Sequence, residues 1–457
     1  MMAPFQGSDI NMFESYYAPG NLRQIFGARA VVESWLMFLR VLAEVQAELG
    51  IIPQEAAEEI RRKSNLDSVP FDRIVKLYAK TRHPGLVTAR ALSEACSNGA
   101  GEYVQYGASA PELWENTLAH RLKKAMDIFD TNLASIRMHL NRLADAHRHT
   151  LMVERSLGRQ ALPTTFGFVA AVWSDAVAKD MDRFHEARKR ILTGFLKGVI
   201  GTYASHYKVA GDKCLEMEKR VLERLGLSSN PISFRRHLER LTEFLNLMVL
   251  LAQTFEKIFN DVFFQQRDEI AELVEPYREG GPSESSTLPQ KRNPVLCQGI
   301  LARCKKIRSN AFAFAETHVH QSHDTIAFSM ENLIIPETCV LVGDLLHEAE
   351  YVLANLGVNA DAMKRNLALS NGLIMTEALM LDLSNRTGKK QEAHTLIHQI
   401  AMEAFEQGVP FNQYIQRNDL INKYFSGDEI EAFLLPVNYL GLIDMCIDSV
   451  LESTRDS

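Results

Sequence analysis

Helical periodicity dominates the sequence. Between Val31 and Leu49, apolar residues recur at intervals of three and four, which places them on one face of a helix: Leu36, Leu39, Leu42, Val45 and Leu49. Gly50 ends this pattern, as glycine commonly does at the end of a helix. Pro53 then introduces a second predicted helix, QEAAEEIRRK, with its acidic residues first and its basic residues last.

Three longer stretches show the same periodicity, over about 113–148, 167–196 and 235–274. Each is about 30 residues or more, well beyond the usual length of a globular helix. Alternating runs of β-branched residues, which would predict strands, are scarce. The pattern therefore predicts an all-α protein built around a bundle of long helices.

Segments rich in glycine or proline interrupt the helical pattern at three places: 97–111 (SNGAGEYVQYGASAP), 158–167 (GRQALPTTFG) and 279–294 (EGGPSESSTLPQKRNP). Such segments cannot continue a helix, and polar chemistry is often found at the helix ends they create. We expect three helical domains, over 1–108, 109–355 and 356–457, with the third interruption as a loop of the central domain.

Composition and charge favour a cytoplasmic protein of ordinary globular type. The chain has 457 residues, with 50 Lys and Arg against 57 Asp and Glu, a net charge of −7 that argues against nucleic acid as the main partner. Its six cysteines lie far apart without a CxxC pair, which argues against disulfides and a zinc site. The N-terminus lacks the features of a signal peptide, and no membrane partner is expected.

The third interruption is the most informative segment. It carries Ser285, Ser286 and Thr287 and leads into Lys291 and Asn293. A fixed positive charge stabilises a nearby alkoxide, so such a hydroxyl can act as a base, while lysine and asparagine donors can hold negative charge that develops on a substrate. The alternative is a flexible linker with one incidental lysine.

The string SSTLPQKRNP, over 285–294, resembles the signature of the fumarase/aspartase superfamily. Two further segments resemble the first and second signatures of this superfamily, in the expected order: 106–109 with Thr117, and 155–156 with 161–167. Three more are similar to the branch of adenylosuccinate lyase and 3-carboxy-cis,cis-muconate cycloisomerase: 201–204, 371–373 and 436–441. The resemblance covers essentially the whole chain.

This resemblance implies a three-domain α-helical homotetramer, joined through its central long helices, with each active site assembled from three subunits. It also implies a lyase reaction on a dicarboxylate, without metal or cofactor. A proton is abstracted beside a carboxylate of a substituted succinate, and a group then leaves from the neighbouring carbon to release fumarate or an analogue.

The resemblance also assigns roles to residues. Ser285 holds the position of the catalytic base, and Lys291 and Asn293 are expected to stabilise the dianion formed by proton abstraction. Residues expected to contact substrate are Ser109, Arg155, Ser156, Ser286, Thr287, Arg23 and Arg240. A structural salt bridge is the alternative for Arg155, and a plain ion pair is the favoured alternative for Arg240.

Several positions depart from the adenylosuccinate lyase pattern. Leu157 replaces a histidine that protonates the leaving group, and an apolar residue at this position is similar to the cycloisomerase branch. Glu112 and Glu284 stand where an aspartate and a glycine are usual. The segment 323–329 reads HDTIAFS where Arg-Asp-x-Ser-His-Ser-Ser would grip a nucleotide, so we expect a substrate without a nucleotide phosphate.

His83 is the best candidate to replace the missing acid. Thr81-Arg82-His83 resembles the Thr-x-His of the first domain of adenylosuccinate lyases, and histidine ordinarily transfers protons near neutral pH. The alternative is a surface or capping histidine. A second group, His318, His320 and His323, does not predict a metal site, because side chains two residues apart on a helix diverge.

Three functions remain open at this point. The leading prediction is a lyase that cleaves a carbon–nitrogen bond of a substituted succinate. The second is a carbon–oxygen reaction of the cycloisomerase type, which the residue at Leu157 favours. The third is an inactive tetrameric scaffold, against which the retention of Ser285, Lys291 and Asn293 argues.

Overall fold

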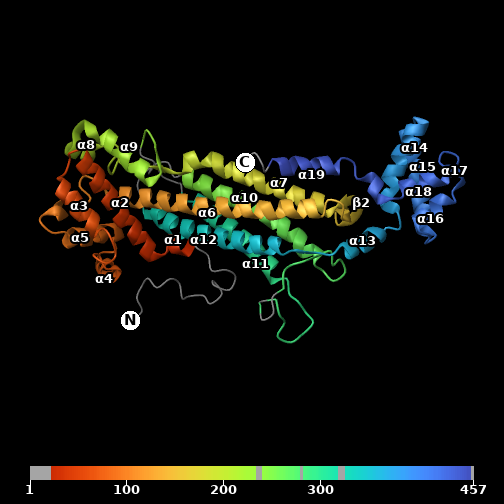
Figure 1. Cartoon of the computed structure of the whole chain (residues 1–457), viewed down its shortest axis with the longest axis horizontal. Coiled ribbons are helices and arrows are strands. Elements are labelled where there is room, and N and C mark those ends of the chain that lie inside the picture. The colour runs from red at the N-terminus through yellow and green to blue at the C-terminus, as the bar shows by residue number, and fades with distance from the viewer. Residues whose placement is uncertain (1–21, 233–238, 278–280, 282, 318–324, 454–457) are drawn as a thin grey trace. The chain divides into compact units, whose positions relative to one another are not determined.

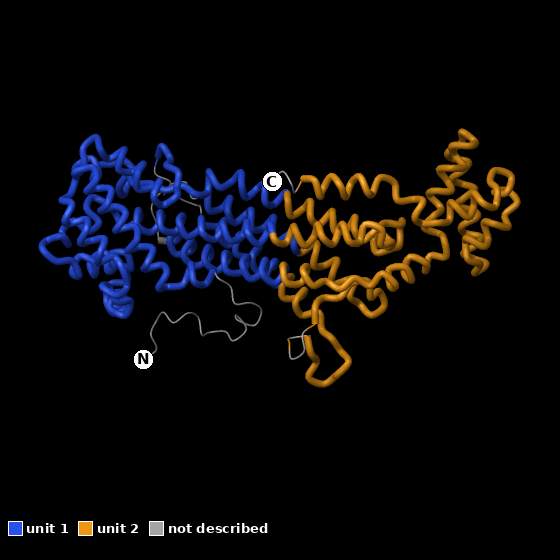
Figure 2. The backbone as a smooth tube through the Cα atoms, viewed as in Figure 1, with its two compact units in different colours: residues 1–134, 179–255, 302–349 blue, residues 135–178, 256–301, 350–457 orange. Residues whose placement is uncertain are grey.

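The computed structural model describes residues 22–232, 239–277, 281, 283–317 and 325–453. Within these ranges the protein is all-α, with three small two-stranded sheets (Figure 1). Contacts between Cα atoms divide the chain into two compact units, shown in Figure 2. Unit 1 comprises 1–134, 179–255 and 302–349, and unit 2 comprises 135–178, 256–301 and 350–457. The division into three domains stays a prediction.

Short helices form the N-terminal part of unit 1. The first predicted helix is α2, in which Leu36, Leu39, Leu42 and Val45 are at most 1% exposed, as the periodicity required. The second predicted helix, α3, has the predicted bounds and follows Pro53 as N-cap. The elements are α1 (Leu22–Phe26), α2 (Ala28–Glu48), α3 (Gln54–Lys63), α4 (Phe71–Thr81), α5 (Pro84–Ala95), η1 (Ala100–Tyr103), α8 (Ala204–Ala210), η2 (Gly211–Lys213) and α9 (Cys214–Leu225).

Five long helices contribute residues to both units: α6 (Ala110–Ala146), α7 (Phe166–Ile191), α10 (Glu239–Gln265), α11 (Val295–Ala315) and α12 (Thr325–Ala354). In α6 a row at helical spacing is at most 2% exposed: Leu118, Leu122, Met126, Phe129 and Leu133. This burial explains a helix much longer than local propensity alone would sustain. The third long helix ends at Gln265, so its predicted extension to about residue 274 is wrong.

The helix α12 is apolar enough to resemble a membrane span, the one described helix that is. Its apolar residues Ile335, Cys339, Val342 and Leu346 are completely buried within the protein itself. Core packing accounts for these residues, whereas 39% of the most apolar window is buried and Ile326 and Leu333 are exposed.

A β-hairpin in unit 2, which the sequence did not predict, follows α6. It pairs β1 (Leu151–Ser156) with β2 (Arg159–Thr165) in antiparallel register. The turn is Leu157-Gly158, with φ of 53° and 76°, the left-handed geometry of a two-residue hairpin turn. Two smaller sheets pair β3 (Thr193–Gly194) with β4 (Ser228–Ser229) and β5 (Leu273–Val274) with β6 (Gly357–Val358).

The C-terminal part of unit 2 is a cluster of short helices with its own core. Its centre is made by aliphatic and aromatic side chains that are at most 3% exposed: Leu383, Ile397, Ile400, Phe411 and Ile415. The cluster is formed by η4 (Leu373–Met375), α14 (Thr376–Thr387), α15 (Lys390–Glu406), α16 (Phe411–Gln416), α17 (Asp419–Asn422) and α18 (Gly427–Phe433). The other C-terminal elements are α13 (Ala360–Ala368), η5 (Pro436–Tyr439) and α19 (Ile443–Glu452).

Candidate active site

The third signature segment forms a hairpin-like loop that stands out from the rest of unit 2 (Figure 2). An antiparallel bridge joins Glu284 to Arg292, and the backbone N–H of Asn293 donates to the carbonyl of Ser283 at 2.8 Å. Ser285 and Lys291 are therefore the next residues beyond the bridged pair, one on each of the two facing segments. The residues predicted as base and dianion stabilisers thus lie on the two facing segments of one loop.

Two residues that the sequence analysis missed hold this loop in unit 2. The Tyr277 hydroxyl donates to Glu284 at 2.9 Å, and the Arg292 guanidinium lies 4.2 Å from the centre of the Tyr277 ring. The Glu275 carboxylate accepts the N–H groups of Leu296 and Cys297, and so caps the start of α11. Both lie before the signature, in a segment without a recognisable pattern.

The hydroxyl of Ser285 accepts hydrogen bonds from the backbone. Its Oγ lies 3.1 Å from the N of Leu288 and 3.5 Å from the N of Thr287. Donors aimed at an oxygen favour its deprotonated form, which is what a serine base requires. Ser285 is half-buried, whereas Ser286 and Thr287 are exposed on the same loop.

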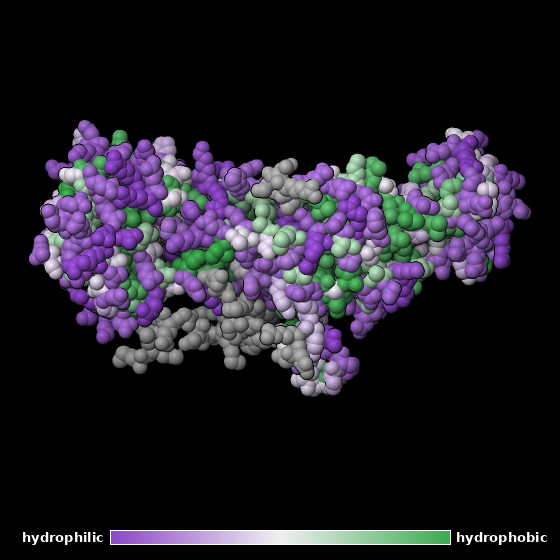
Figure 3. Space-filling model, viewed as in Figure 1, coloured by the Kyte–Doolittle hydropathy of each residue, from purple (hydrophilic) through white to green (hydrophobic). Residues whose placement is uncertain are grey.

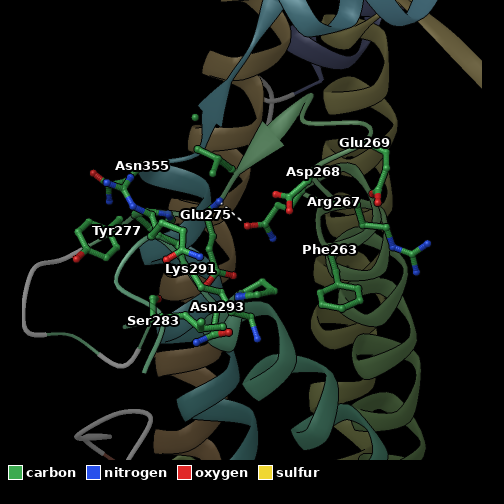
Figure 4. A pocket seen from close by; sticks show the side chains of 18 residues that line it. Phe263, Arg267, Asp268, Glu269, Glu275, Tyr277, Ser283, Lys291, Asn293 and Asn355 are labelled. Carbon is green, nitrogen blue, oxygen red and sulfur yellow. Dashed lines mark hydrogen bonds between the residues drawn. The ribbon is translucent and has the colours of Figure 1, made fainter. Parts of the chain in front are cut away.

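A cleft of 1070 Å³ lies beside this loop within unit 2. Figure 4 shows Ser283, Lys291 and Asn293 on one side of it, with Arg267 and Asp268 on the other. The described lining does not include Ser285. The cleft therefore collects the predicted dianion stabilisers, and cationic, acidic and amide groups share its walls.

Ser109, at the first signature segment in unit 1, is engaged internally. Both its backbone N and its Oγ donate to the same oxygen of Glu112, at 2.6 and 2.8 Å. The Glu112 side chain thus satisfies the backbone N–H of the residue that precedes α6, which is one half of a capping box. Because a serine hydroxyl has a single hydrogen, Ser109 has none left to donate to a substrate carboxylate in this arrangement.

Glu112 is the centre of a buried network and is itself fully buried. Its second carboxylate oxygen accepts from the N of Gly198 at 2.7 Å and from Nε2 of His206 at 2.8 Å. His206 is also fully buried, and its Nδ1 has no hydrogen-bond partner among the described residues. Glu112, a departure noted in the sequence, therefore ties the first signature segment to the chain at Gly198.

Arg155 forms an ion pair within unit 2. Its two terminal nitrogens donate to the two oxygens of Glu272, at 2.8 and 2.7 Å. Glu272 is fully buried and also accepts from Asn366 at 2.7 Å. The predicted clamp on a substrate carboxylate is here occupied by a carboxylate of the protein, so the structure shows the structural alternative.

The other two arginines are also paired, both within unit 1. Arg240 is buried and donates to Glu115 at 3.2 Å. Burial lowers the pKa of Arg240. Arg23 lies 3.2 Å from Asp344, whose pKa is raised by burial. These contacts support structural ion pairs for both.

Ser156 and Leu157 lie at the tip of the β1–β2 hairpin. Ser156 pairs with Arg159 across the turn and is exposed. Leu157 is 101% exposed, so its whole side chain faces out of this chain. A large apolar side chain in a left-handed turn and in full contact with solvent is unfavourable in an isolated chain.

His83 is the N-cap of α5, as the capping alternative proposed. Its Nδ1 accepts the N–H of Leu86 at 3.2 Å, so Nδ1 carries no proton and Nε2 does. A positively charged imidazolium would also carry a hydrogen on Nδ1, and this N–H would point at the N–H of Leu86. In this conformation His83 is therefore suited to donate a hydrogen bond from Nε2, and acting as an imidazolium acid would break the cap.

The predicted residues fall into two groups. Unit 2 carries Ser285, Ser286, Thr287, Lys291, Asn293, Arg155 and Ser156, and unit 1 carries Ser109, His83, Arg23 and Arg240. The histidines His318, His320 and His323 lie outside the described residues. Within the ranges that the structure covers, no group of three His, Cys, Asp or Glu side chains could hold a metal.

Comparison with known proteins agrees with this signature loop and the all-α fold. The family described as Lyase matches residues 16–309, more than half of the chain, and the adenylosuccinate lyase C-terminus family matches residues 372–450. The chain belongs to this lyase family. It is an enzyme of the fumarase/aspartase superfamily, in the branch of adenylosuccinate lyase and 3-carboxy-cis,cis-muconate cycloisomerase.

Relatives of different specificity are about equally similar. The chain is 34% identical to an adenylosuccinate lyase of Methanocaldococcus jannaschii over 96% of this chain and 95% of that one. It is 33% identical to an N-acetyl-S-(2-succino)cysteine lyase of Dickeya dadantii over 90% and 89%. Among solved structures, a β-carboxy-cis,cis-muconate cycloisomerase of Acinetobacter calcoaceticus aligns with a TM-score of 0.88 and 25% identity, over 97% of this chain and 100% of that one.

Proposed function

We propose that this lyase eliminates a heteroatom group from a 2-substituted succinate, with Ser285 as the base. The observation that carries the proposal is the hydrogen bonding of Ser285, whose Oγ accepts from Leu288 at 3.1 Å and retains its own hydrogen. Once the Ser285 hydroxyl has released this hydrogen to solvent, the alkoxide takes a proton from the substrate carbon and becomes a hydroxyl again, which leaves a dianion on the substrate. Lys291 and Asn293, on the same loop, are the donors that hold it.

The leaving group decides whether a proton donor is needed. An amine must be protonated as it leaves, whereas a thiolate is stable near neutral pH, since a thiol has an ordinary pKa of about 8.5. Leu157 cannot donate a proton, and His83 is engaged as a cap. These two observations favour a carbon–sulfur bond over the carbon–nitrogen bond of the leading sequence-based prediction.

Membership of this lyase family supports assembly of the chain as a homotetramer with shared active sites. Leu157 is fully exposed, and unit 2 also exposes Leu369 and Phe405 by 64% and 70%. Hydrophobic side chains appear on the surface near β2 and α13 in Figure 3. Exposed apolar surface of this kind is typical of protein interfaces, so we expect Leu157 to be covered by another copy of the chain.

A three-substrate comparison tests the proposal. The purified protein is incubated separately with N-acetyl-S-(2-succino)cysteine, adenylosuccinate and a carboxymuconate lactone, and fumarate release or ring opening is followed. We expect fumarate from the thioether at the highest rate. Faster release of fumarate from adenylosuccinate would instead support cleavage of a carbon–nitrogen bond. Ring opening of the lactone would support the cycloisomerase reaction. If none of the three compounds reacts, the inactive scaffold is the alternative that remains.

A further inference from the structure

Tyr277 contacts both segments of the loop that carries the third signature. Its hydroxyl donates to the Glu284 carboxylate at 2.9 Å, and the centre of its ring lies 4.2 Å from the guanidinium carbon of Arg292. Glu284 and Arg292 are the two residues that the antiparallel bridge joins, and all three residues belong to unit 2. One side chain, from a segment that precedes the loop, therefore contacts both members of the bridged pair.

The bridge also determines how the neighbouring side chains are directed. In an antiparallel pair, opposite residues project to the same face, and successive residues of each segment alternate between the two faces. The bridged pair projects toward Tyr277, so Ser285 and Lys291, opposite each other one position further along, are directed to the other face. The N–H of Asn293 donates to the carbonyl of Ser283 at 2.8 Å, which continues the same register on the other side of the bridge.

The face on which the Glu284 side chain lies bears on the proposed base. Glycine is usual at this position, and a carboxylate close to Ser285 would disfavour its alkoxide. The hydrogen bond to Tyr277 holds the Glu284 carboxylate on the face opposite Ser285. Contact of the tyrosine ring with Arg292 likewise leaves Lys291 as the cation of the bridge region that shares a face with Ser285.

We propose that Tyr277 is a positioning residue of this lyase, which holds the bridged pair so that Ser285 and Lys291 stay opposite each other on one face of the loop. The inference rests on the proposed function, in which Ser285 is the base and Lys291 stabilises the dianion. In this role Tyr277 acts through the loop and does not touch the substrate. Its loss therefore lowers kcat and leaves KM nearly unchanged, because the dianion develops only as the reaction proceeds.

The test compares kcat and KM of purified variants with the succinate that the wild type turns over fastest. Tyr277→Leu removes both contacts and should lower kcat about 10²-fold with KM within about 3-fold, the loss typical of a displacement of about 1 Å between reacting groups. Tyr277→Phe keeps the ring on Arg292 and should lose about 10-fold or less. Unchanged kcat in Tyr277→Leu, or a rise in KM at constant kcat, overturns the proposal.

Variants of Glu284 test the same contact from its other end and retain the tyrosine ring. Glu284→Ala should lower kcat about as much as Tyr277→Phe. The double variant should lose no more than either single variant, because both changes remove one hydrogen bond. Glu284→Gln keeps an oxygen that accepts from the tyrosine and should retain most of the activity. Losses that multiply in the double variant overturn the proposal.

A matched control is Tyr414→Phe. The Tyr414 hydroxyl donates to Glu403 at 2.8 Å in the C-terminal cluster of unit 2, so this variant removes the same type of hydrogen bond outside the signature loop. Its kcat should stay within about 2-fold of wild type, as is usual for a change of this kind near the surface. A loss equal to that of Tyr277→Phe would show a general effect of stability and would overturn the proposal.

Failure of the proposed function is separable from failure of this inference. If the wild type turns over no succinate, the elimination is wrong, and the geometry of the loop then decides the inference. Hydrogen–deuterium exchange of segment 283–293, followed by mass spectrometry without substrate, should be about 10-fold faster in Tyr277→Leu, because the bond from Asn293 to Ser283 opens as the register loosens. Tyr414→Phe should leave this exchange unchanged. Exchange at the wild-type rate in Tyr277→Leu rejects the inference, whatever the activity.

Discussion

Two serines of the signature segments, Ser109 in unit 1 and Ser285 in unit 2, have opposite hydrogen bonding. Ser109 donates its hydroxyl proton to Glu112 at 2.8 Å and holds the start of α6. Ser285 accepts from the backbone of Leu288 at 3.1 Å and keeps its proton available. Both sit in signature segments, so motif resemblance alone assigns chemistry to each.

The difference lies in which partner surrounds the oxygen. A carboxylate beside a hydroxyl opposes loss of its proton, whereas N–H donors favour the alkoxide. Ser109 is therefore held as a cap, while the hydrogen bonds of Ser285 are compatible with its proposed role as the base. Residue type and position in a motif do not distinguish the two serines, whereas the direction of the hydrogen bond does.

The largest expected effect comes from Ser285→Ala. Removing the base should lower kcat by at least about 10³, in line with loss of a general base and its positioning. Ser286→Ala changes the exposed neighbour and should cost far less, about 10-fold or below. Steady-state elimination rates measure both, and similar losses in the two variants would show that the loop contributes through its conformation instead.

Lys291→Met and Asn293→Ala are expected to come next. Each removes one donor for the dianion and should lower kcat about 10²–10³-fold with a smaller change in KM, because the charge is greatest in the transition state. Kinetics with the preferred succinate test this expectation. A rise in KM at constant kcat would instead show that these residues bind the ground-state carboxylates.

Glu112→Gln probes the other half of the comparison through stability. The amide directs an NH2 at donors that now face a carboxylate, so about 3 kcal/mol of folding stability should be lost. Thermal unfolding followed by circular dichroism reports the change. An unaltered unfolding temperature would mean that the contacts to Gly198 and His206 contribute little.

Ser109→Ala should have the smallest effect, about 1 kcal/mol of stability from the lost cap and less than about 10-fold in kcat/KM. Ser426→Ala is its matched control, because the N and Oγ of Ser426 donate to Glu429 at the start of α18 as those of Ser109 do to Glu112. Comparable losses of stability in both variants are expected. A loss of activity in Ser109→Ala as large as in Ser285→Ala would remove the distinction between the two serines.

Sequence patterns predicted local features better than long-range contacts. The bounds of α3 follow from Pro53 and the order of its charges, but the β1–β2 hairpin was missed because its strands are short and the pattern around them is helical. Lys291 and Asn293 could be proposed as dianion stabilisers because one motif holds them. The role of Glu112 could not be predicted, since its partners Gly198 and His206 lie more than 80 residues away in the sequence.

Exchange of the substrate carbon-bound proton with solvent tests the central claim most directly, since it reports the base even when no group leaves. N-acetyl-S-(2-succino)cysteine is incubated in heavy water with each variant, and deuterium at the carbon beside the carboxylate is followed by NMR. We predict incorporation of one deuterium with wild type and with Ser109→Ala, and none above background with Ser285→Ala. Exchange at the wild-type rate in Ser285→Ala would contradict the assignment of Ser285 as the base.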